Sequence, residues 1–449
     1  TRSNATEALE AKAAEIVLAD RKKHKYKAPF FTSYIVKQLI EMYGEESTYT
    51  SGMKVYTSLD YTLQERAESV VRQYVEIGQK PAWIKGERVD NLNFTEGALM
   101  AVDPRTGHIK ALQGGVDFVN NEFNRCIQSK RQPGSSFKPF VYLTALKKGF
   151  SPGFIMDDAP IAYNTIEGVY EPQNYSLKFR GRMPLVKALE RSVNVVAVKL
   201  NDLVGPENVV KTARKLGIES PLKPVLSLPL GANEVSMLEL VQSYMVLANR
   251  GIKVKPVSIL KIEDRDGVML HKHKLKEEKV YDSNLIAILV NMMKNVVNYG
   301  TGRGAKLPRP MAGKTGTTSD YKDAWFAGFV PQLVCVTWVG NDDNTPMHNV
   351  TGGWIPARMW KSFMIKALSK TKAQAFPRPK GLESAEVNWE TGLRVSSATP
   401  DDAKKSTLLY FPKQVPKEKD SASIIQALAL KESKQKQATD NLLDYFDIQ

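Results

Sequence analysis

The chain of 449 residues is predicted to be an α+β protein, with an antiparallel β-sheet flanked by helices and accompanied by a helical subdomain. Two early segments, Gly97–Val102 and His108–Gln113, have strand character and are joined by a turn. Residues 184–250 have mainly helical spacing, clearest at Met237–Asn249. Strand patterns return later, at Val254–Ile262, Trp325–Val330 and Val334–Val339. Strands on both sides of a helical middle favour one antiparallel sheet with helices on both faces.

The segments before this sheet are predicted to be mostly helical. Residues 6–43 have helical spacing that Pro29 divides, and we expect a linker that packs against whatever precedes it. Met53–Leu59 alternates like a strand, and Leu63–Ile77 has the spacing of a helix with an apolar face. Only 78–93 separates this helix from the sheet, too short for an inserted β-domain.

Length and composition suggest two or three structural units with ample core in the largest. We expect a linker region at 1–60, a helix and short connection at 61–93, and the main domain at 94–375. A short β extension is expected at 376–416, with a hairpin near Val387–Gly392. Residues 417–449 are charged and are expected to be a mobile tail or one marginal helix.

The formal net charge of +15 predicts attraction to polyanions. No nucleic-acid motif is recognisable, so we expect an anionic membrane surface or wall polymer and no nucleic acid. The two cysteines are too few for a disulfide framework. The five histidines have no convincing ligand spacing, and neither a metal nor a cofactor is expected. No apolar run approaches the ~18 residues of a membrane span.

Three short motifs stand in one order along the chain: Ser135-Ser136-Phe137-Lys138, Ser192-Val193-Asn194 and Lys314-Thr315-Gly316. Ser-x-x-Lys occurs seven times here, so one copy alone means little, whereas Ser-x-Asn and Lys-Thr-Gly occur once each. Together they are the signature of a serine acyl-transfer site that reacts with β-lactams and D-Ala-D-Ala peptides.

The first motif supplies the candidate nucleophile. Pro133-Gly134 breaks the chain before Ser135, and Phe137–Lys147 has helical spacing. Ser135 would lie in the first turn, where free backbone N–H groups favour negative charge, and Lys138 would share its helix face. A serine needs a neighbouring base, and a lysine can act as one only if burial or a second cation lowers its pKa.

The other motifs supply its partners. Ser192 is expected to relay protons, and Asn194 to hold a substrate amide, from a loop or strand. Lys314 is expected to be the second cation on a strand edge that also carries Gly316, which would let substrate approach the backbone. Candidate substrate-binding residues are Thr315, Gly316, Thr317 and Thr318. The backbone N–H groups of Ser135 and Thr317 are candidates for an oxyanion hole.

Beyond these motifs, the chain resembles the transpeptidase part of class A (bifunctional) penicillin-binding proteins over roughly residues 25–415. The resemblance extends to Phe123-Asn124-Arg125, Arg131–Phe140, Pro172-Gln173-Asn174-Tyr175, Gly231–Ser236, Gly300-Thr301-Gly302, Asp323–Gly328 and Gly352-Gly353. It implies the penicillin-binding/serine β-lactamase-like transpeptidase fold. The family's transmembrane anchor and glycosyltransferase domain have no match here, and we expect them in the full-length protein.

The resemblance implies a peptidoglycan D,D-transpeptidase that cross-links stem peptides through a serine acyl-enzyme and is inhibited covalently by β-lactams. It implies a place at the outer face of the bacterial cytoplasmic membrane, anchored by an N-terminal segment absent here. A serine β-lactamase or D,D-carboxypeptidase shares the three motifs and would use water as acceptor. A non-catalytic sensor of β-lactams or wall peptides is the remaining alternative.

Overall fold

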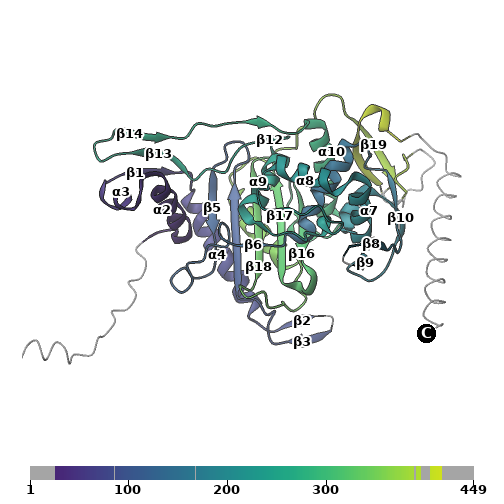
Figure 1. The fold of residues 1–449 in the computed structure, drawn as a ribbon, viewed down its shortest axis with the longest axis horizontal. Helices are drawn as coiled ribbons and strands as arrows, with labels where there is room; N and C mark the ends of the chain where they lie inside the picture. Colours follow the sequence, from purple (N-terminus) through teal and green to yellow (C-terminus); the bar gives the residue numbers. More distant parts are fainter. Residues whose placement is uncertain (1–25, 85, 167, 389–390, 396–404, 417–449) are drawn as a thin grey trace, which may run out of the picture.

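The centre of the molecule is a five-stranded antiparallel sheet in the order β16-β17-β18-β4-β5 (Figure 1). The computed structural model describes residues 26–84, 86–166, 168–388, 391–395 and 405–416. The strands are β4 (Glu96–Val102), β5 (Ile109–Gln113), β16 (Ala312–Thr317), β17 (Asp323–Val330) and β18 (Leu333–Gly340). Every residue of β17 and β18 is buried, because other elements cover both faces of the sheet. The predicted α+β class is confirmed.

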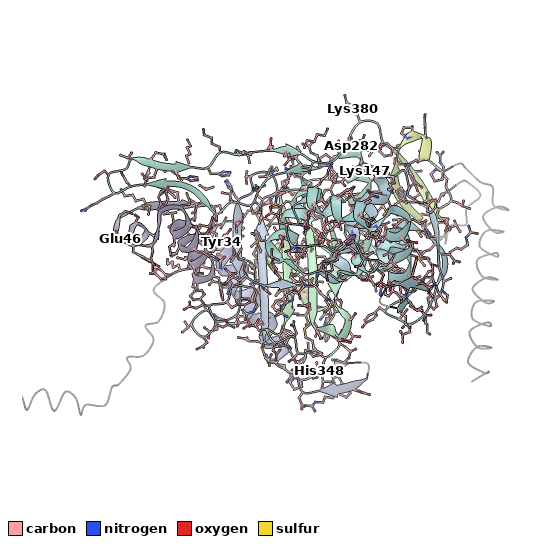
Figure 2. The ribbon with its side chains drawn as sticks, viewed as in Figure 1. Tyr34, Glu46, Lys147, Asp282, His348 and Lys380 are labelled. Carbon is pink, nitrogen blue, oxygen red and sulfur yellow. The ribbon has the colours of Figure 1, made fainter. Side chains whose placement is uncertain are left out.

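Helices lie on both faces of this sheet. Helix α9 (Met237–Ala248) packs against β4, β17 and β18 on one face, and α4 (Tyr61–Gly78) and α11 (Ile355–Ala367) cover the other. Two hydrophobic clusters result, one on each side. Figure 2 shows side chains filling the space between the helices and the sheet. Helix α9 begins with a capping box between Ser236 and Glu239, which fixes its first turn.

A helical subdomain stands beside strand β16. It comprises α5 (Lys138–Lys147), α6 (Leu185–Arg191), α7 (Asn194–Val204) and α8 (Pro206–Leu216), and α10 (Ser283–Asn298) joins it to β16. Lys138 to Leu146 are all buried, so α5 is the central helix of this group. The expected helix at Phe137–Lys147 therefore exists, but begins one residue later.

One strand predicted for the central sheet lies outside it, which corrects the expectation of one sheet. Val254–Ile262 was too long as a strand, since β13 spans Ile259–Glu263. It pairs with β1 (Lys54–Thr57) and β14 (Met269–Lys272) in a separate three-stranded sheet. Figure 1 shows this sheet at one end of the molecule, beside α2 (Pro29–Tyr43) and α3 (Glu45–Thr50).

Helix α2 packs against the main body of the protein, although we expected it to pack on what precedes it. Its Phe30 and Phe31 are buried in the cluster that includes β4 and β5. Phe30 stacks edge-on against Phe118 at 4.9 Å, and the Asn124 side-chain amide donates to its carbonyl at 3.1 Å. The earlier half of the predicted helical region lies outside the described residues, as does the charged tail.

Short elements complete the fold. The two-stranded ribbons are β2 (Ala82–Ile84) with β3 (Glu87–Val89), β6 (Lys130–Arg131) with β11 (Val235–Ser236), β7 (Ile155–Asp158) with β10 (Gly181–Pro184), β8 (Tyr163–Thr165) with β9 (Gly168–Tyr170), β12 (Ile252–Lys253) with β15 (Glu278–Lys279), and β19 (Glu383–Asn388) with β20 (Lys405–Tyr410). The 3-10 turns are η1 (Gly134–Phe137), η2 (Leu228–Leu230), η3 (Arg303–Ala305), η4 (Ser319–Tyr321) and η5 (Pro412–Gln414). Within the described ranges, no helix has the length and apolar character that crossing a membrane requires.

Candidate active site

The three motifs meet where the helical subdomain borders strand β16. Ser135 lies in η1, directly before α5, and Lys138 is the first residue of that helix. Ser192 ends α6, and Asn194 begins α7. Lys314 lies in β16, the edge strand of the central sheet. The fold thus brings together Lys138, Ser192 and Lys314, which are 54 and 122 positions apart in the chain.

Lys138 is held by three oxygen atoms of the second motif. Its Nζ donates to the Ser192 carbonyl at 2.6 Å, to the Ser192 hydroxyl at 3.2 Å and to Asn194 Oδ1 at 2.7 Å. The side chain is fully buried. Burial, and then the positive charge of Lys314, lower the pKa of Lys138 well below its usual value. A neutral lysine amine has two hydrogens and one lone pair, so in this state Lys138 donates to only two of these oxygens and keeps the lone pair that a general base needs.

Lys314 and Lys138 share one hydroxyl group. The Lys314 Nζ donates to Ser192 Oγ at 2.8 Å, and burial lowers the pKa of Lys314 to about 7. Ser192 adopts a left-handed backbone with φ 57°, which turns the chain sharply between two helices. The Ser192 oxygen accepts from Lys314, and because a hydroxyl both accepts and donates, its own hydrogen can be given to another group. Ser192 is therefore suited to pass a proton to an atom in the site.

The turn that carries Ser135 is fixed by hydrogen bonds from two other elements. The Trp325 indole donates to the Gln132 carbonyl at 3.0 Å, and the buried Tyr244 hydroxyl donates to the Ser136 carbonyl at 2.8 Å. The described part of the chain offers the Ser135 hydroxyl itself no hydrogen-bond partner, and this residue is partly exposed. The turn is rigid while its candidate nucleophile is free to rotate.

Gly316 lets β16 lie close to this turn, and its expected role in substrate approach stays a prediction. A Cβ atom at position 316 would lie 2.3 Å from the Pro133 carbonyl oxygen, so only glycine lets β16 approach the turn this closely. Gly134, at φ 55°, meets the Thr317 backbone from the other direction, since a Cβ there would lie 2.6 Å from the Thr317 carbonyl oxygen. The two glycines hold the Ser135 and Thr317 backbones side by side, as an oxyanion hole from their N–H groups requires.

The three threonines after Lys314 differ in exposure and in their hydrogen-bond partners. Thr317 is partly exposed, and its hydroxyl accepts from the Gly352 N–H at 3.1 Å. Thr315 is buried, with its hydroxyl 2.9 Å from that of Thr301. Thr318 is also buried, and its hydroxyl accepts from the Asp323 N–H at 2.8 Å, which closes the β16–β17 connection. Thr318 therefore makes a framework contact, and its expected role in substrate binding stays a prediction.

Sequence reasoning gave no role to Asn174, although it quoted the segment that contains it. The Asn174 side chain is buried and accepts hydrogen bonds from the backbone N–H groups of Asn194 at 2.9 Å and Val195 at 3.2 Å. A buried side-chain amide needs hydrogen-bond partners, but the burial of Asn174 becomes visible only in the structure. The pattern could not reveal that those partners lie in the second motif.

A cleft of about 720 Å³ opens beside Asn194 and Thr318. Its charged lining residues are Arg131, Glu171, Glu234, Asp320, Lys322 and Asp323. Near its walls, the hydroxyls of Tyr175 and Tyr321 lie 2.7 Å apart, so the loop before α6 touches the turn after β16. Through Asn194 and Thr318 the cleft adjoins the second motif and the end of β16.

The sequence of this chain is similar to those of known proteins. Residues 97–351, more than half of the chain, match the family described as "Penicillin binding protein transpeptidase domain". Penicillin-binding protein 2D of Bacillus subtilis is 33% identical over 403 residues, which are 87% of this chain and 55% of that protein. Penicillin-binding protein 1A of Aquifex aeolicus is 39% identical over 294 residues, 64% of this chain and 40% of that protein. The chain thus spans about half the length of these relatives, or less.

Solved structures agree with the family match. The PonA1 protein from Mycobacterium tuberculosis in complex with penicillin V has a TM-score of 0.68 at 26% identity, covering 78% of this chain and 96% of that one. Penicillin-binding protein 1A from Haemophilus influenzae has a TM-score of 0.78 at 23% identity, covering 92% of this chain and 80% of that one, and shows the fold alone. By family match and by fold, the chain belongs to the penicillin-binding protein transpeptidase family.

Proposed function

We propose that this chain is the transpeptidase part of a class A (bifunctional) penicillin-binding protein, and that it cross-links peptidoglycan stem peptides as a D,D-transpeptidase. The observation that carries the proposal is the Ser192 hydroxyl, which lies between the buried amines of Lys138 and Lys314. The turn with Ser135 adjoins this pair. Such an arrangement supplies a base, a proton relay and a cation beside one free serine hydroxyl.

Acylation is the first half of the proposed reaction. Lys138 takes the proton of the Ser135 hydroxyl, and Ser135 Oγ attacks the carbonyl carbon between the two D-alanines of a donor stem peptide. The oxyanion that forms is stabilised by the backbone N–H groups of Ser135 and Thr317. Ser192 passes a proton to the leaving nitrogen, so that free D-alanine departs and an ester to Ser135 remains.

Substrate recognition falls to the β16 side and to Asn194. Lys314, with Thr315 and Thr317, is suited to the terminal carboxylate of the donor, because a lysine cation and nearby hydroxyls match an anionic group. Asn194 is suited to a substrate amide through its Nδ2 group, whose present acceptor is the Gln173 carbonyl at 3.0 Å. Gly316 and Thr318 contribute by holding β16 in place.

Transfer completes the reaction. An amine of a neighbouring stem peptide attacks the ester carbonyl, a new amide bond forms, and the proton returns through Lys138 to Ser135. A β-lactam imitates the donor, but its leaving nitrogen stays tethered to the acyl group, so that the enzyme remains acylated. The same site thus accounts for covalent inhibition by β-lactams.

Localisation and further domains follow from the class. We infer that the chain works at the outer face of the bacterial cytoplasmic membrane, where peptidoglycan is assembled. A glycosyltransferase domain and a membrane anchor N-terminal to this region would complete the bifunctional protein, because the relatives are about twice as long as the region they share with it.

Intact-mass spectrometry after addition of benzylpenicillin tests the proposal. We expect a gain of one drug molecule that persists for hours and vanishes in Ser135→Ala. Ser369→Ala is the matched control, because Ser369 begins another Ser-x-x-Lys copy at an exposed position, and it should be acylated like the native chain. An intact drug with no adduct would contradict serine acyl transfer, and a destroyed drug with no adduct would indicate a β-lactamase.

A donor peptide separates transfer from hydrolysis. With a thioester analogue of the D-Ala-D-Ala donor and a D-amino acid acceptor, we expect the acyl group to appear mainly on the acceptor amine. Release of free acid alone would identify a carboxypeptidase. Lasting acylation by the drug without turnover of any donor would favour a sensor.

A further inference from the structure

A buried carboxylate lies behind the second motif, outside the residues that the proposed reaction uses. Asp158, at the end of β7, is fully buried. Its two oxygens accept from Asn174 Nδ2 at 2.7 Å and from the Arg180 backbone N–H at 2.9 Å. Among the described residues it has no ion pair within 4 Å. Burying a carboxylate without a close ion pair has a high free-energy cost, so we expect Asp158 to serve a function at this position.

The carboxylate fixes which way the Asn174 amide points. An ionised carboxylate accepts only, so the Asn174 nitrogen must face Asp158, where it also donates to the Lys178 carbonyl at 3.1 Å. The amide oxygen is then directed at the first turn of α7, where it accepts from the N–H groups of Asn194 and Val195. The N-cap residue Val193 has no side-chain cap of its own. Asn174 therefore caps α7 from a separate loop.

The capped turn carries the group that holds Lys138. Asn194 Oδ1 accepts from Lys138 Nζ at 2.7 Å, while its Nδ2 donates to the Gln173 carbonyl. The loop that Asp158 anchors thus holds the nitrogen end of the Asn194 amide and so directs its oxygen at Lys138. A short series of hydrogen bonds runs from Asp158 through Asn174 and Asn194 to the candidate base.

We propose that Asp158 and Asn174 are positioning residues for the acylation step, and that they act through Asn194 on the orientation of Lys138. This inference rests on the proposed function, because it assigns the pair a task in the same reaction. Asp158 touches neither substrate nor Ser135. Its effect on the reaction passes through the helix cap and through its negative charge.

Removing the charge has two consequences of different kind. In Asp158→Asn one carboxylate oxygen becomes an NH2 group, so either Asn174 Nδ2 or the Arg180 N–H faces a donor, and the loop that holds Asn174 loses one of its two anchoring hydrogen bonds. The groups whose charges act on Lys138 are Lys314 from β16, which lowers its pKa, and Asp158 from β7, which raises it. Loss of Asp158 therefore lowers the pKa of Lys138 further and moves the acidic limb of the acylation profile to lower pH.

The test is the pH profile of the acylation rate with benzylpenicillin, followed by intact mass, in Asp158→Asn, Asn174→Ala and the double variant. We expect each single variant to lose about 10²-fold at its optimum, as a misplaced catalytic group does. The double variant should lose no more than the worse single one, because both act through one cap. In Asp158→Asn the acidic limb should also move to lower pH, which a merely structural defect would not cause.

Asp157→Asn is the matched control, since Asp157 is the exposed neighbour on the same strand and should leave the rate and the profile unchanged. Circular dichroism checks that each variant is folded, and Asn174→Ala carries the test if Asp158→Asn does not fold. Single variants with the native rate, or losses that multiply in the double variant, would overturn the proposal. A native chain that is not acylated would instead overturn the proposed function.

Discussion

Two buried lysines that share one hydroxyl are the most consequential residues of this protein. Lys138 and Lys314 are both fully buried, and each donates to Ser192 Oγ. Two adjacent ammonium groups in one dry site repel each other, so one amine gives up its proton first. Lys138 has the second cation beside it and no partner carboxylate within 4 Å among the described residues, which suits it to the neutral role.

Acylation by benzylpenicillin is expected to have a bell-shaped pH dependence. The rate should fall at acidic pH as Lys138 is protonated, and fall again above about 7 as Lys314 loses the charge that attracts the drug's carboxylate. The rate of mass gain between pH 5 and 9 measures both limbs. Benzylpenicillin methyl ester, which has no carboxylate, is the control and should show a slower reaction without the alkaline limb. An unchanged alkaline limb with the ester would contradict this role of Lys314.

Burial of Lys314 also predicts how stability changes with pH. With a pKa of about 7 in the folded protein and the ordinary value when unfolded, the unfolded chain binds more protons in the interval between them. The free energy of unfolding therefore rises with pH across this interval, by at most about 1.4 kcal/mol per pH unit for one proton. In Lys314→Met this part of the slope should disappear. Urea unfolding at several pH values measures the difference, and equal slopes in both proteins would show that Lys314 does not titrate in this way.

At the scale of elements, the site is formed where several helices and strands begin, end or lie at an edge. A 3-10 turn, the junction of two helices and an edge strand each contribute one motif, and none would hold its shape alone. The contact between η1 and β16 is the tightest of these junctions, because Gly316 lies directly against the Pro133 backbone. Hydrogen bonds from Trp325 and Tyr244 fix the same turn.

Gly316→Ala is expected to disrupt this junction. The added Cβ would stand 2.3 Å from the Pro133 carbonyl oxygen, so β16 or the turn must move. We expect a loss of about 1–3 kcal/mol in the free energy of unfolding and of at least about 10²-fold in the acylation rate. Denaturant titration measures the change in the free energy of unfolding, and the mass assay measures the change in the acylation rate. Gly149→Ala is a control for lost glycine elsewhere, since a Cβ there meets nothing within 4 Å, although its φ of 94° adds local strain. Native acylation in Gly316→Ala would contradict the tight contact.

The sequence predicted long apolar elements well and junctions poorly. The strands β4, β5, β17 and β18 lie within two residues of their predicted bounds, because continuous apolar runs leave few alternatives. The prediction for Val254–Ile262 was wrong in extent because only Ile259–Ile262 belong to β13, and the residues before them form a connection. The contact of Gly316 with Pro133 joins segments far apart in the chain, which no local pattern encodes. The motifs identified the candidate residues from the sequence, whereas the capping of α7 by Asn174 could be recognised only in the folded structure.

At the scale of the whole molecule, the segment before the main domain is part of the core. Helix α2 buries Phe30, Phe31, Ile35 and Leu39, and the Gln38 side-chain amide bonds to Ser258 Oγ at 2.8 Å. These contacts tie α2 to β5 and to the second sheet. A boundary drawn near residue 94 on sequence grounds therefore still leaves apolar contacts across it.

Phe30→Ala tests how strongly α2 supports the molecule. Phe30 is fully buried and packs edge-on against Phe118, so its truncation leaves a cavity. We expect a loss of about 3–5 kcal/mol in the free energy of unfolding. Tyr49→Ala, at a side chain that is 64% exposed, is the control and should change the free energy by less than about 0.5 kcal/mol. Equal stability of both variants would mean that α2 contributes little.

The pairing of β4 with β18 has a consequence for the making of this protein. Val102 pairs with Val334 and Glu96 with Gly340, so the partner of β4 is synthesised more than two hundred residues later. At roughly 5–20 residues per second, the apolar β4 ribbon waits about 10–50 s before its partner exists. During that time β4 can pair only with β5, and its other edge is open to wrong partners. A nascent chain stopped before Leu333 should therefore be aggregation-prone and unreactive with penicillin, although Ser135, Lys138, Ser192 and Lys314 have all been made.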